Sequence, residues 1–184
     1  SARPARSHGR AELVASWGMP QLQAHGDGVA SYVERIDASL DWVAGPGPPA
    51  LAARFRLSGD LAQLAIPAPG EARRADGLWR HTCFEFFLRP RGAAGYAEVN
   101  LAPSTEWAAY AFSAYREGMT AIDAIAPAIE VSVSPGALAL VAQLPLAALA
   151  GSPAASFEVA LSAVVEANDG TLSWWALAHP APQR

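Results

Sequence analysis

Residues 76–90 read D-G-L-W-R-H-T-C-F-E-F-F-L-R-P, and after a glycine-rich break residues 96–100 read Y-A-E-V-N. Over residues 82–89 the side chains alternate between two faces, as they do in a β-strand. One face is apolar and suits a protein core: it carries Thr82, Phe84, Phe86 and Leu88. The other face carries Cys83, Glu85, Phe87 and Arg89. This mixture of an acid, a thiol and an aromatic ring is typical either of a solvated surface or of the floor of a ligand site.

We expect these two segments to form a hairpin that turns near Arg91-Gly92. A turn at this position places three pairs of residues opposite each other, with an uncertainty of two residues in the register: Glu85 and Glu98, Phe87 and Tyr96, and Cys83 and Asn100. Opposed carboxylates repel each other, so they favour a cation, an arginine or a polyhydroxyl ligand between them. Two alternatives remain open for the acids: a solvated strand face, or the paired carboxylates of a glycoside-processing enzyme.

The same alternation predicts strands along most of the remaining chain. A proline-glycine turn joins two of them, alanine-rich residues 106–116 are interpreted as a strand rather than a helix, and Leu146 to Ala150 are expected to form one helical turn. Trp42 falls on the apolar side of its strand and is predicted to be in the core. The further predicted strands cover residues 36–42, 51–58, 129–134, 138–142, 157–165 and 172–178. About nine or more short strands with almost no helix indicate an all-β fold, an antiparallel β-sandwich.

Length and composition favour a single domain. The chain has 184 residues, of which 52% are hydrophobic and 16% charged, which excludes a disordered protein. Residues 1–27 show little periodicity and are predicted to be a loosely ordered extension. Residues 28–184 are predicted to be one β-sandwich domain that binds a ligand.

Charge and cysteine content exclude several partners. The net charge is −4 without a basic stripe, so nucleic acid is not expected as a partner. No apolar run reaches the length of a membrane span, and the first residues lack the apolar region of an intact signal peptide. The single cysteine, Cys83, excludes an internal disulfide and favours a reducing compartment such as the cytoplasm.

Catalytic and metal-binding motifs are missing from the sequence: there is no G-x-S-x-G, H-E-x-x-H or C-x-x-C and no glycine-rich phosphate loop. We therefore predict a non-catalytic protein without a metal. Cys83 and His81 are close enough to be considered a nucleophile pair, but an ordinary strand thiol is the favoured interpretation. An alternative function is the binding of b-type haem, with His81 or His179 and Met119 as axial ligands.

The six tryptophans suggest a binding surface. Trp79 follows a glycine in a loop, Trp107 opens a strand, and Trp174 and Trp175 cannot both point inward, because neighbouring residues of a strand face opposite ways. Exposed aromatic rings rimmed by polar groups mark binding sites. Sugar rings stack on such rings through their C–H groups, while carboxylates and amides bind the hydroxyls.

Three segments carry a resemblance to a known family: G-L-W-R-H-T-C-F-E-F-F-L from residue 77, Y-A-E-V-N-L-A-P-S-T-E-W-A-A-Y-A-F-S-A-Y-R-E-G-M from residue 96, and S-W-W-A-L-A-H-P from residue 173. In these segments the sequence resembles the DOMON-like proteins related to the family 9 carbohydrate-binding modules. The resemblance implies a β-sandwich that binds sugars or, as in the haem-binding DOMON relatives, a b-type haem.

The resemblance also implies site residues. In the sugar-binding modules two tryptophans enclose a terminal sugar, and an acid six residues after the first tryptophan binds its hydroxyls; Trp79 and Glu85 have a similar spacing. Trp174 or Trp175 would supply the other wall. Glu98, Asn100 and Arg116 are the further expected hydroxyl partners, and the secondary candidates are His81, Cys83, Tyr96, Trp107 and His179. His81 and Cys83 stand where that family often has acidic residues, which argues against structural calcium.

Overall fold

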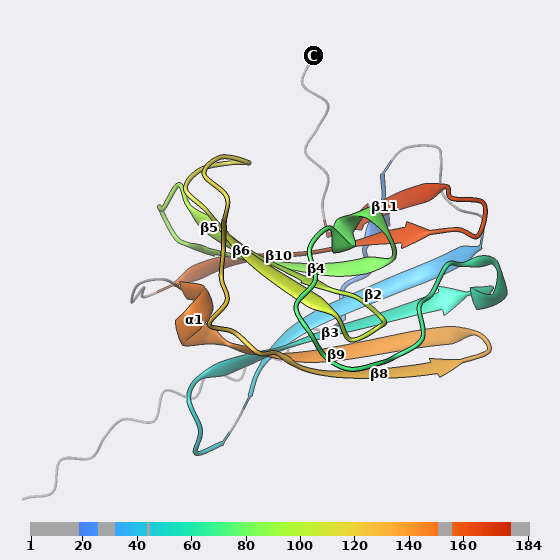
Figure 1. Ribbon diagram of the computed structural model, residues 1–184, viewed down its shortest axis with the longest axis horizontal. Helices are drawn as coiled ribbons and strands as arrows, with labels where there is room; N and C mark the ends of the chain where they lie inside the picture. Colours follow the sequence, from blue (N-terminus) through green and yellow to red (C-terminus); the bar gives the residue numbers. More distant parts are fainter. Residues whose placement is uncertain (1–18, 26–31, 44, 151–155, 178–184) are drawn as a thin grey trace, which may run out of the picture.

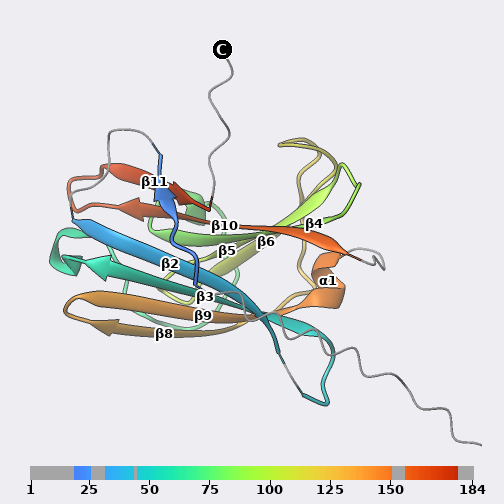
Figure 2. The same cartoon turned by 180° about the vertical axis from the view of Figure 1, so that it is seen from behind.

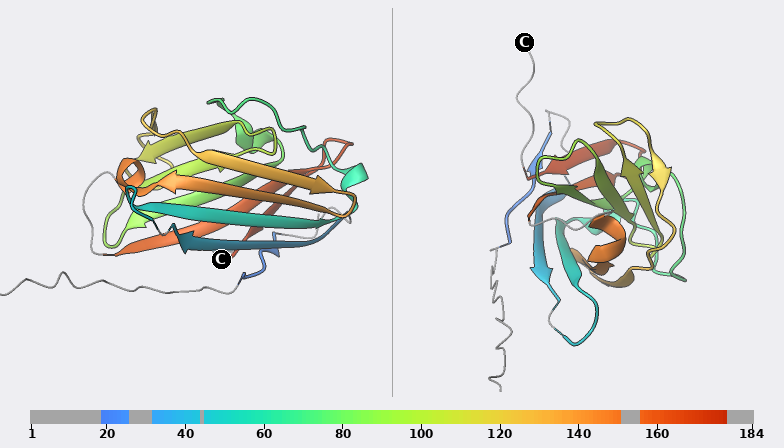
Figure 3. Two further views of the ribbon diagram at one scale, coloured as in Figure 1. Left: turned by 90° about the horizontal axis from the view of Figure 1, so that it is seen from below. Right: turned by 90° about the vertical axis from the view of Figure 1, so that its left-hand side faces the viewer.

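The protein folds into two antiparallel β-sheets packed face to face, as the sequence predicts. The computed structural model describes residues 19–25, 32–43, 45–150 and 156–177. One sheet has seven strands in the order β1-β11-β10-β4-β5-β6-β7, and the other has four in the order β2-β3-β9-β8 (Figure 1). The view from below shows the sheets as two layers (Figure 3).

Nine of the eleven strands in the described part of the chain were predicted, and the two-residue strands β1 and β7 were not. Their bounds are β1 Gln23–Ala24, β2 Val33–Trp42, β3 Ala50–Gly59, β4 Cys83–Pro90, β5 Tyr96–Leu101, β6 Trp107–Phe112, β7 Thr120–Ala121, β8 Ala128–Ser134, β9 Ala137–Pro145, β10 Phe157–Glu166 and β11 Leu172–Ala176. Three short helical segments accompany them: η1 Leu61–Gln63, η2 Leu78–Arg80 and α1 Leu146–Ala150. The predicted helical turn and the hairpin of β8 and β9 are confirmed, and the strand predicted over residues 106–116 forms over the shorter range of β6.

The core fills the space between the sheets. Phe55 of β3 stacks on Phe84 of β4, with ring centroids 4.9 Å apart, so one aromatic contact joins the two layers. Phe84, Phe86 and Leu88 are buried, as the alternation in β4 predicts. Burial of each such side chain contributes about 1.5–3 kcal/mol to folding. α1 lies at one end of the sandwich (Figure 3) and inserts Leu149 into this core.

The register of the central hairpin is shifted by two residues from the central prediction, which is the full margin allowed for it. The turn does form at Arg91-Gly92, where the amide of Ala93 donates to the carbonyl of Pro90. Ala94 and Gly95 then follow outside the ladder, so Glu85 pairs with Asn100 and Phe87 with Glu98. Only glycine fits at position 95 without a shift of the backbone, because a Cβ there would lie 2.7 Å from the carbonyl oxygen of Phe112. The two unpaired residues shift the return strand and place the two acids diagonally instead of directly opposite.

Trp42 is not in the core: half of its surface, 50%, is exposed. It is the last residue of β2 and pairs with Leu51. Its ring lines a groove with Arg54 and Glu130 on the outer face of the four-stranded sheet, so it does not lie between the two sheets.

The segment 19–25 belongs to the sandwich rather than to an extension. β1 pairs with β11 (Figure 2), and Leu22 is fully buried in the core. The amide of Leu22 also donates to the carbonyl of Ile36 at 2.8 Å. The boundary predicted after residue 27 is therefore too late. The rest of the predicted extension, residues 1–18 and 26–27, lies outside the described residues.

Phe84→Ala tests the contact between the sheets. We expect the free energy of unfolding to fall by about 3–5 kcal/mol, because the substitution leaves a cavity that the core cannot close. Urea denaturation followed by circular dichroism measures the change. Val133→Ala is the control, because this side chain near the end of β8 is 53% exposed, and the expected change is within about 0.5 kcal/mol. Equal effects of the two substitutions would contradict this description of the core.

Candidate functional site

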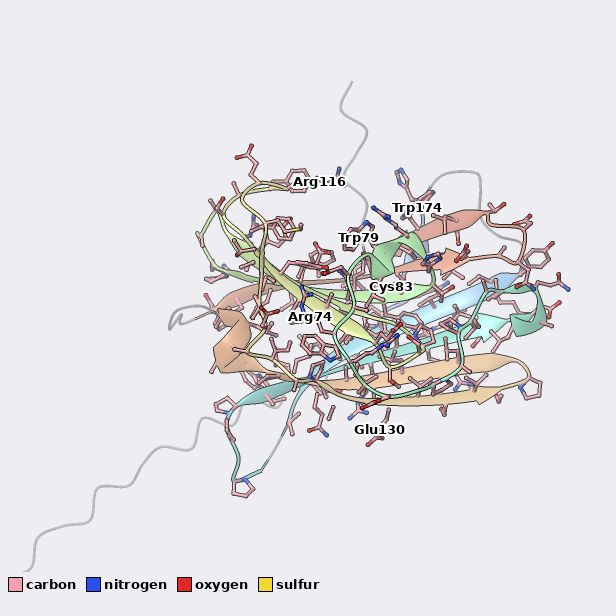
Figure 4. The ribbon with its side chains drawn as sticks, viewed as in Figure 1. Arg74, Trp79, Cys83, Arg116, Glu130 and Trp174 are labelled. Carbon is pink, nitrogen blue, oxygen red and sulfur yellow. The ribbon has the colours of Figure 1, made fainter. Side chains whose placement is uncertain are left out.

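The outer face of the seven-stranded sheet carries a groove of about 470 Å³. Strands β4, β5, β6, β10 and β11 form its floor, and loop residues rise at its ends. Figure 4 shows Trp79 and Trp174 near each other and Arg116 on a separate loop. The lining residues are Trp79, Glu85, Phe87, Tyr96, Glu98, Tyr110, Phe112, Tyr115, Arg116, Met119, Val164 and Trp174.

Five of the seven main predicted site residues line this groove: Trp79, Glu85, Glu98, Arg116 and Trp174. Tyr96, a secondary candidate, lines it as well. The strand alternation explains this grouping, because Glu85, Glu98 and Tyr96 all occupy the face of the hairpin opposite to the core. The loops that bring Trp79 and Arg116 to the same face could not be placed from periodicity.

Two carboxylates form the polar part of the floor. Glu85 accepts a hydrogen bond from the hydroxyl of Ser162 on β10 at 2.5 Å. Glu98 accepts one from the amide Nδ2 of Asn100 at 2.9 Å. Each contact involves one carboxylate oxygen, so the second oxygen of each acid remains available to a ligand.

Burial makes both acids harder to ionise. The pKa of Glu85 is raised, mainly because burial removes water from the carboxylate and also because the charge of Glu98 repels it. Burial also raises the pKa of Glu98, although the bond from Asn100 and the charge of Arg116 act in the opposite direction. A ligand that donates hydrogen bonds to these oxygens compensates for the lost water.

Trp79 forms one aromatic wall of the groove. It lies on η2, which starts after Gly77 in the left-handed conformation at φ 78°, and 37% of its surface is exposed. Its ring meets the ring of Tyr110 edge to face at 5.9 Å. The preceding segment is tied to β6, because Trp107 donates its amide to Arg73 and accepts a bond from the amide of Ala75.

Arg74 connects this wall to the sheet, a role that the sequence did not indicate. Its guanidinium lies over the Tyr110 ring, 5.6 Å from the centroid, and forms ion pairs with Asp76 at 3.0 Å and Asp123 at 3.1 Å. The Tyr110 hydroxyl donates to Asp76 at 2.6 Å. This bond, with the adjacent Arg74, lowers the pKa of Asp76, while burial and the Asp76 carboxylate raise the pKa of Tyr110 to about 12.

Trp174 forms a second wall. Half of its surface, 50%, is exposed, whereas Trp175 is buried and donates its indole N–H to the hydroxyl of Ser173 at 3.0 Å. The expectation that one of the two faces outward is confirmed, and the structure identifies it as Trp174. Trp175 belongs to the core, so its assignment to the site is wrong.

The far end of the groove is also aromatic. Tyr96 and Phe112 stack with centroids 4.7 Å apart, and Arg116 lies over the exposed ring of Tyr115 at 5.3 Å. Arg116 adopts a positive φ of 60°, and its amide donates to the Tyr96 hydroxyl at 3.4 Å. Sequence analysis missed Phe112 and Tyr110, although they share one face of the predicted strand over residues 106–116.

Asn100 and Cys83 lie beneath the groove instead of lining it. Both are fully buried; Asn100 holds Glu98, and the Cys83 thiol is 3.9 Å from the Asn100 Oδ1. Burial raises the pKa of the Cys83 thiol well above its ordinary value. This thiol is therefore a structural group. The imagined pair with His81 is not formed, since His81 Nδ1 contacts Glu166 Oε2 at 2.7 Å.

The remaining predicted ligands are scattered. Trp107 is buried in the core. Met119 lines the groove, but His81 does not, so the described residues do not bring that haem pair together. His179 lies outside the described residues. The haem alternative stays a prediction.

A second groove, of about 370 Å³, lies on the outer face of the four-stranded sheet. Its lining includes Trp42, Arg54, Glu130 and Gln143 and contains none of the predicted site residues. Glu130 lies on the opposite side of the molecule from Trp79 and Trp174 (Figure 4). None of the helices in the described part of the chain has the length and hydropathy needed to cross a bilayer.

Comparison with known proteins identifies the fold. No protein-family model matches the sequence, and no curated protein matches it. The fold is similar to a crystal structure described as "a putative carbohydrate-binding protein" from Bacteroides uniformis ATCC 8492, with a TM-score of 0.60. The two chains are 12% identical, and the match covers 90% of this chain and 78% of that chain. At this identity, the likeness shows a shared β-sandwich fold.

Asp76→Asn tests the network behind Trp79. Because the pKa of Asp76 is lowered in the folded protein, its charge stabilises the fold above the unfolded-state pKa of about 4, and this contribution is lost as pH falls through the folded-state pKa. We therefore expect the variant to have a lower Tm than the wild type at neutral pH. The difference should shrink at acidic pH. A Tm difference that stays constant from neutral to acidic pH would contradict the assigned role of this carboxylate.

Proposed function

We propose that the protein binds a carbohydrate or similar polyol in the groove between Trp79 and Trp174, without catalysing a reaction. The observation that carries the proposal is the presence of two exposed indole rings and two carboxylates in one groove. Aromatic faces and charged acceptors are the two kinds of group that a sugar needs, because its ring has an apolar C–H face and a rim of hydroxyls.

The polar groups have suitable roles for hydroxyl recognition. Ser162 and Asn100 orient Glu85 and Glu98, and the second oxygen of each acid accepts a hydrogen bond from a ligand hydroxyl. Bonds to a charged acceptor are about twice as strong as neutral ones. Arg116 lines the same groove and supplies donors for a ring or hydroxyl oxygen.

Two likenesses support this proposal. The solved structure with a similar fold is described as carbohydrate-binding. The resemblance to the DOMON-like proteins related to the family 9 carbohydrate-binding modules assigns Trp79 and Glu85 to a sugar site, and both line the groove. Trp174 then takes the place of the second tryptophan wall.

Titration of tryptophan fluorescence with mono- and disaccharides tests the proposal. We expect saturable quenching or a blue shift, and an affinity at least about tenfold weaker in Trp79→Ala and in Trp174→Ala, because each variant removes an anchoring aromatic residue. Trp42→Ala is the matched control: its ring is as exposed as that of Trp174 but lies at the other groove. The control should leave affinity unchanged.

Three results would contradict the proposal. Unchanged sugar affinity in both groove variants would show that the site is elsewhere. Hydrolysis of aryl glycosides that disappears in Glu85→Gln would show that the protein is an enzyme. A Soret band in the absorbance spectrum of the purified protein would favour haem as the ligand.

A further inference from the structure

The charges in the groove do not balance. In the part of the chain that the structure describes, its charged lining consists of two carboxylates, Glu85 and Glu98, and one guanidinium, Arg116. Outside the lining, Arg74 is already shared by two carboxylates, Asp76 and Asp123, so it does not supply the positive charge that the groove lacks. The ionised groove therefore favours a ligand that brings a positive charge.

The positive charge that the groove lacks would be most favourable next to Glu85. Arg116 acts electrostatically on Glu98, whereas the groups that act on Glu85 are the neutral hydroxyl of Ser162 and the like charge of Glu98. The raised pKa of Glu85 fits a buried carboxylate without a cation next to it. A hydroxyl ligand satisfies its hydrogen bonding but leaves this charge uncompensated.

The aromatic rings also favour a cation. Trp79, Trp174, Phe87 and Tyr110 line the groove together with Glu85. The face of an aromatic ring attracts a cation that lies within about 6 Å of its centroid, and indole attracts it most strongly. An ammonium group next to Glu85 would gain both from the carboxylate and from the surrounding rings.

We propose that the ligand is an amino sugar whose ammonium group binds Glu85 between Trp79 and Trp174. Its hydroxyls then bind Glu98, which lies diagonally across from Glu85 on the floor, and Arg116 on the loop at the far end of the groove. This inference rests on the proposed sugar-binding function and adds the chemical class of the sugar.

Three sugars that differ at one substituent test the inference: D-glucosamine, D-glucose and N-acetyl-D-glucosamine. We titrate each by calorimetry at about pH 6.5, where an amine is protonated. An ammonium bound next to Glu85 favours the ionised carboxylate and so opposes the effect of burial on its pKa. Glucosamine should bind at least about tenfold more tightly than either neutral sugar, since its bond to Glu85 is charge-assisted on both sides. Raising the salt concentration should reduce this preference.

Glu85→Gln keeps the size of the side chain and removes its charge. The preference for glucosamine should disappear in this variant, and Glu130→Gln, on the opposite face of the molecule, should retain it. Circular dichroism verifies that both variants fold. The wild-type comparison alone decides the inference if Glu85→Gln does not fold.

Two outcomes overturn the inference, and they are distinguishable. If glucose or N-acetylglucosamine binds as tightly as glucosamine, the amino-sugar assignment is wrong and the proposed sugar-binding function stands. If none of the sugars tested here or in the saccharide titration binds, both the inference and the proposed function fail.

Discussion

The ladder of β4 with its two neighbours is the constraint on which the rest of the structure depends. β4 pairs with β10 on one side and β5 on the other, so its side chains alternate strictly between the core and the outer face. Phe84 and Phe86 join the core, and Phe84 stacks on Phe55 of the opposite sheet. The same ladder puts Glu85 and Phe87 in the groove. A slip of one residue would exchange the core face for the face that lines the groove.

Local patterning was sufficient to predict the fold class and part of the site. Alternation identified most of the strands, and two adjacent tryptophans on one strand required that one face outward. Alternation assigns a residue to one face of a strand but does not determine how far its side chain is covered, and the prediction for Trp42 failed because its ring lines the groove on the outer face of the four-stranded sheet. The same limit applies to Trp107, which is buried although it opens a strand at a predicted site position.

The remaining features depend on contacts between distant segments. Ala94 and Gly95 lie between the turn and β5, and the backbone at Gly95 passes so close to Phe112 that a Cβ would not fit, which the sequence does not reveal. Arg74, Asp76 and Asp123 meet on Tyr110 from three different segments. Arg116 reaches the groove through a left-handed backbone conformation that no residue preference predicts for an arginine. Sequence periodicity therefore predicts which strand residues form the floor of the groove, but it does not predict which loop residues lie at its ends.

The central claim is that a sugar lies between the rings of Trp79 and Trp174. The most direct measurement is a titration of the isotope-labelled protein with the tightest-binding sugar, followed through the indole N–H signals in two-dimensional NMR spectra. The account predicts large shifts for Trp79 and Trp174 and little change for the buried Trp107 and Trp175 or for the exposed Trp42. Shifts confined to Trp42, or none at Trp79 and Trp174 while the sugar binds, would contradict it.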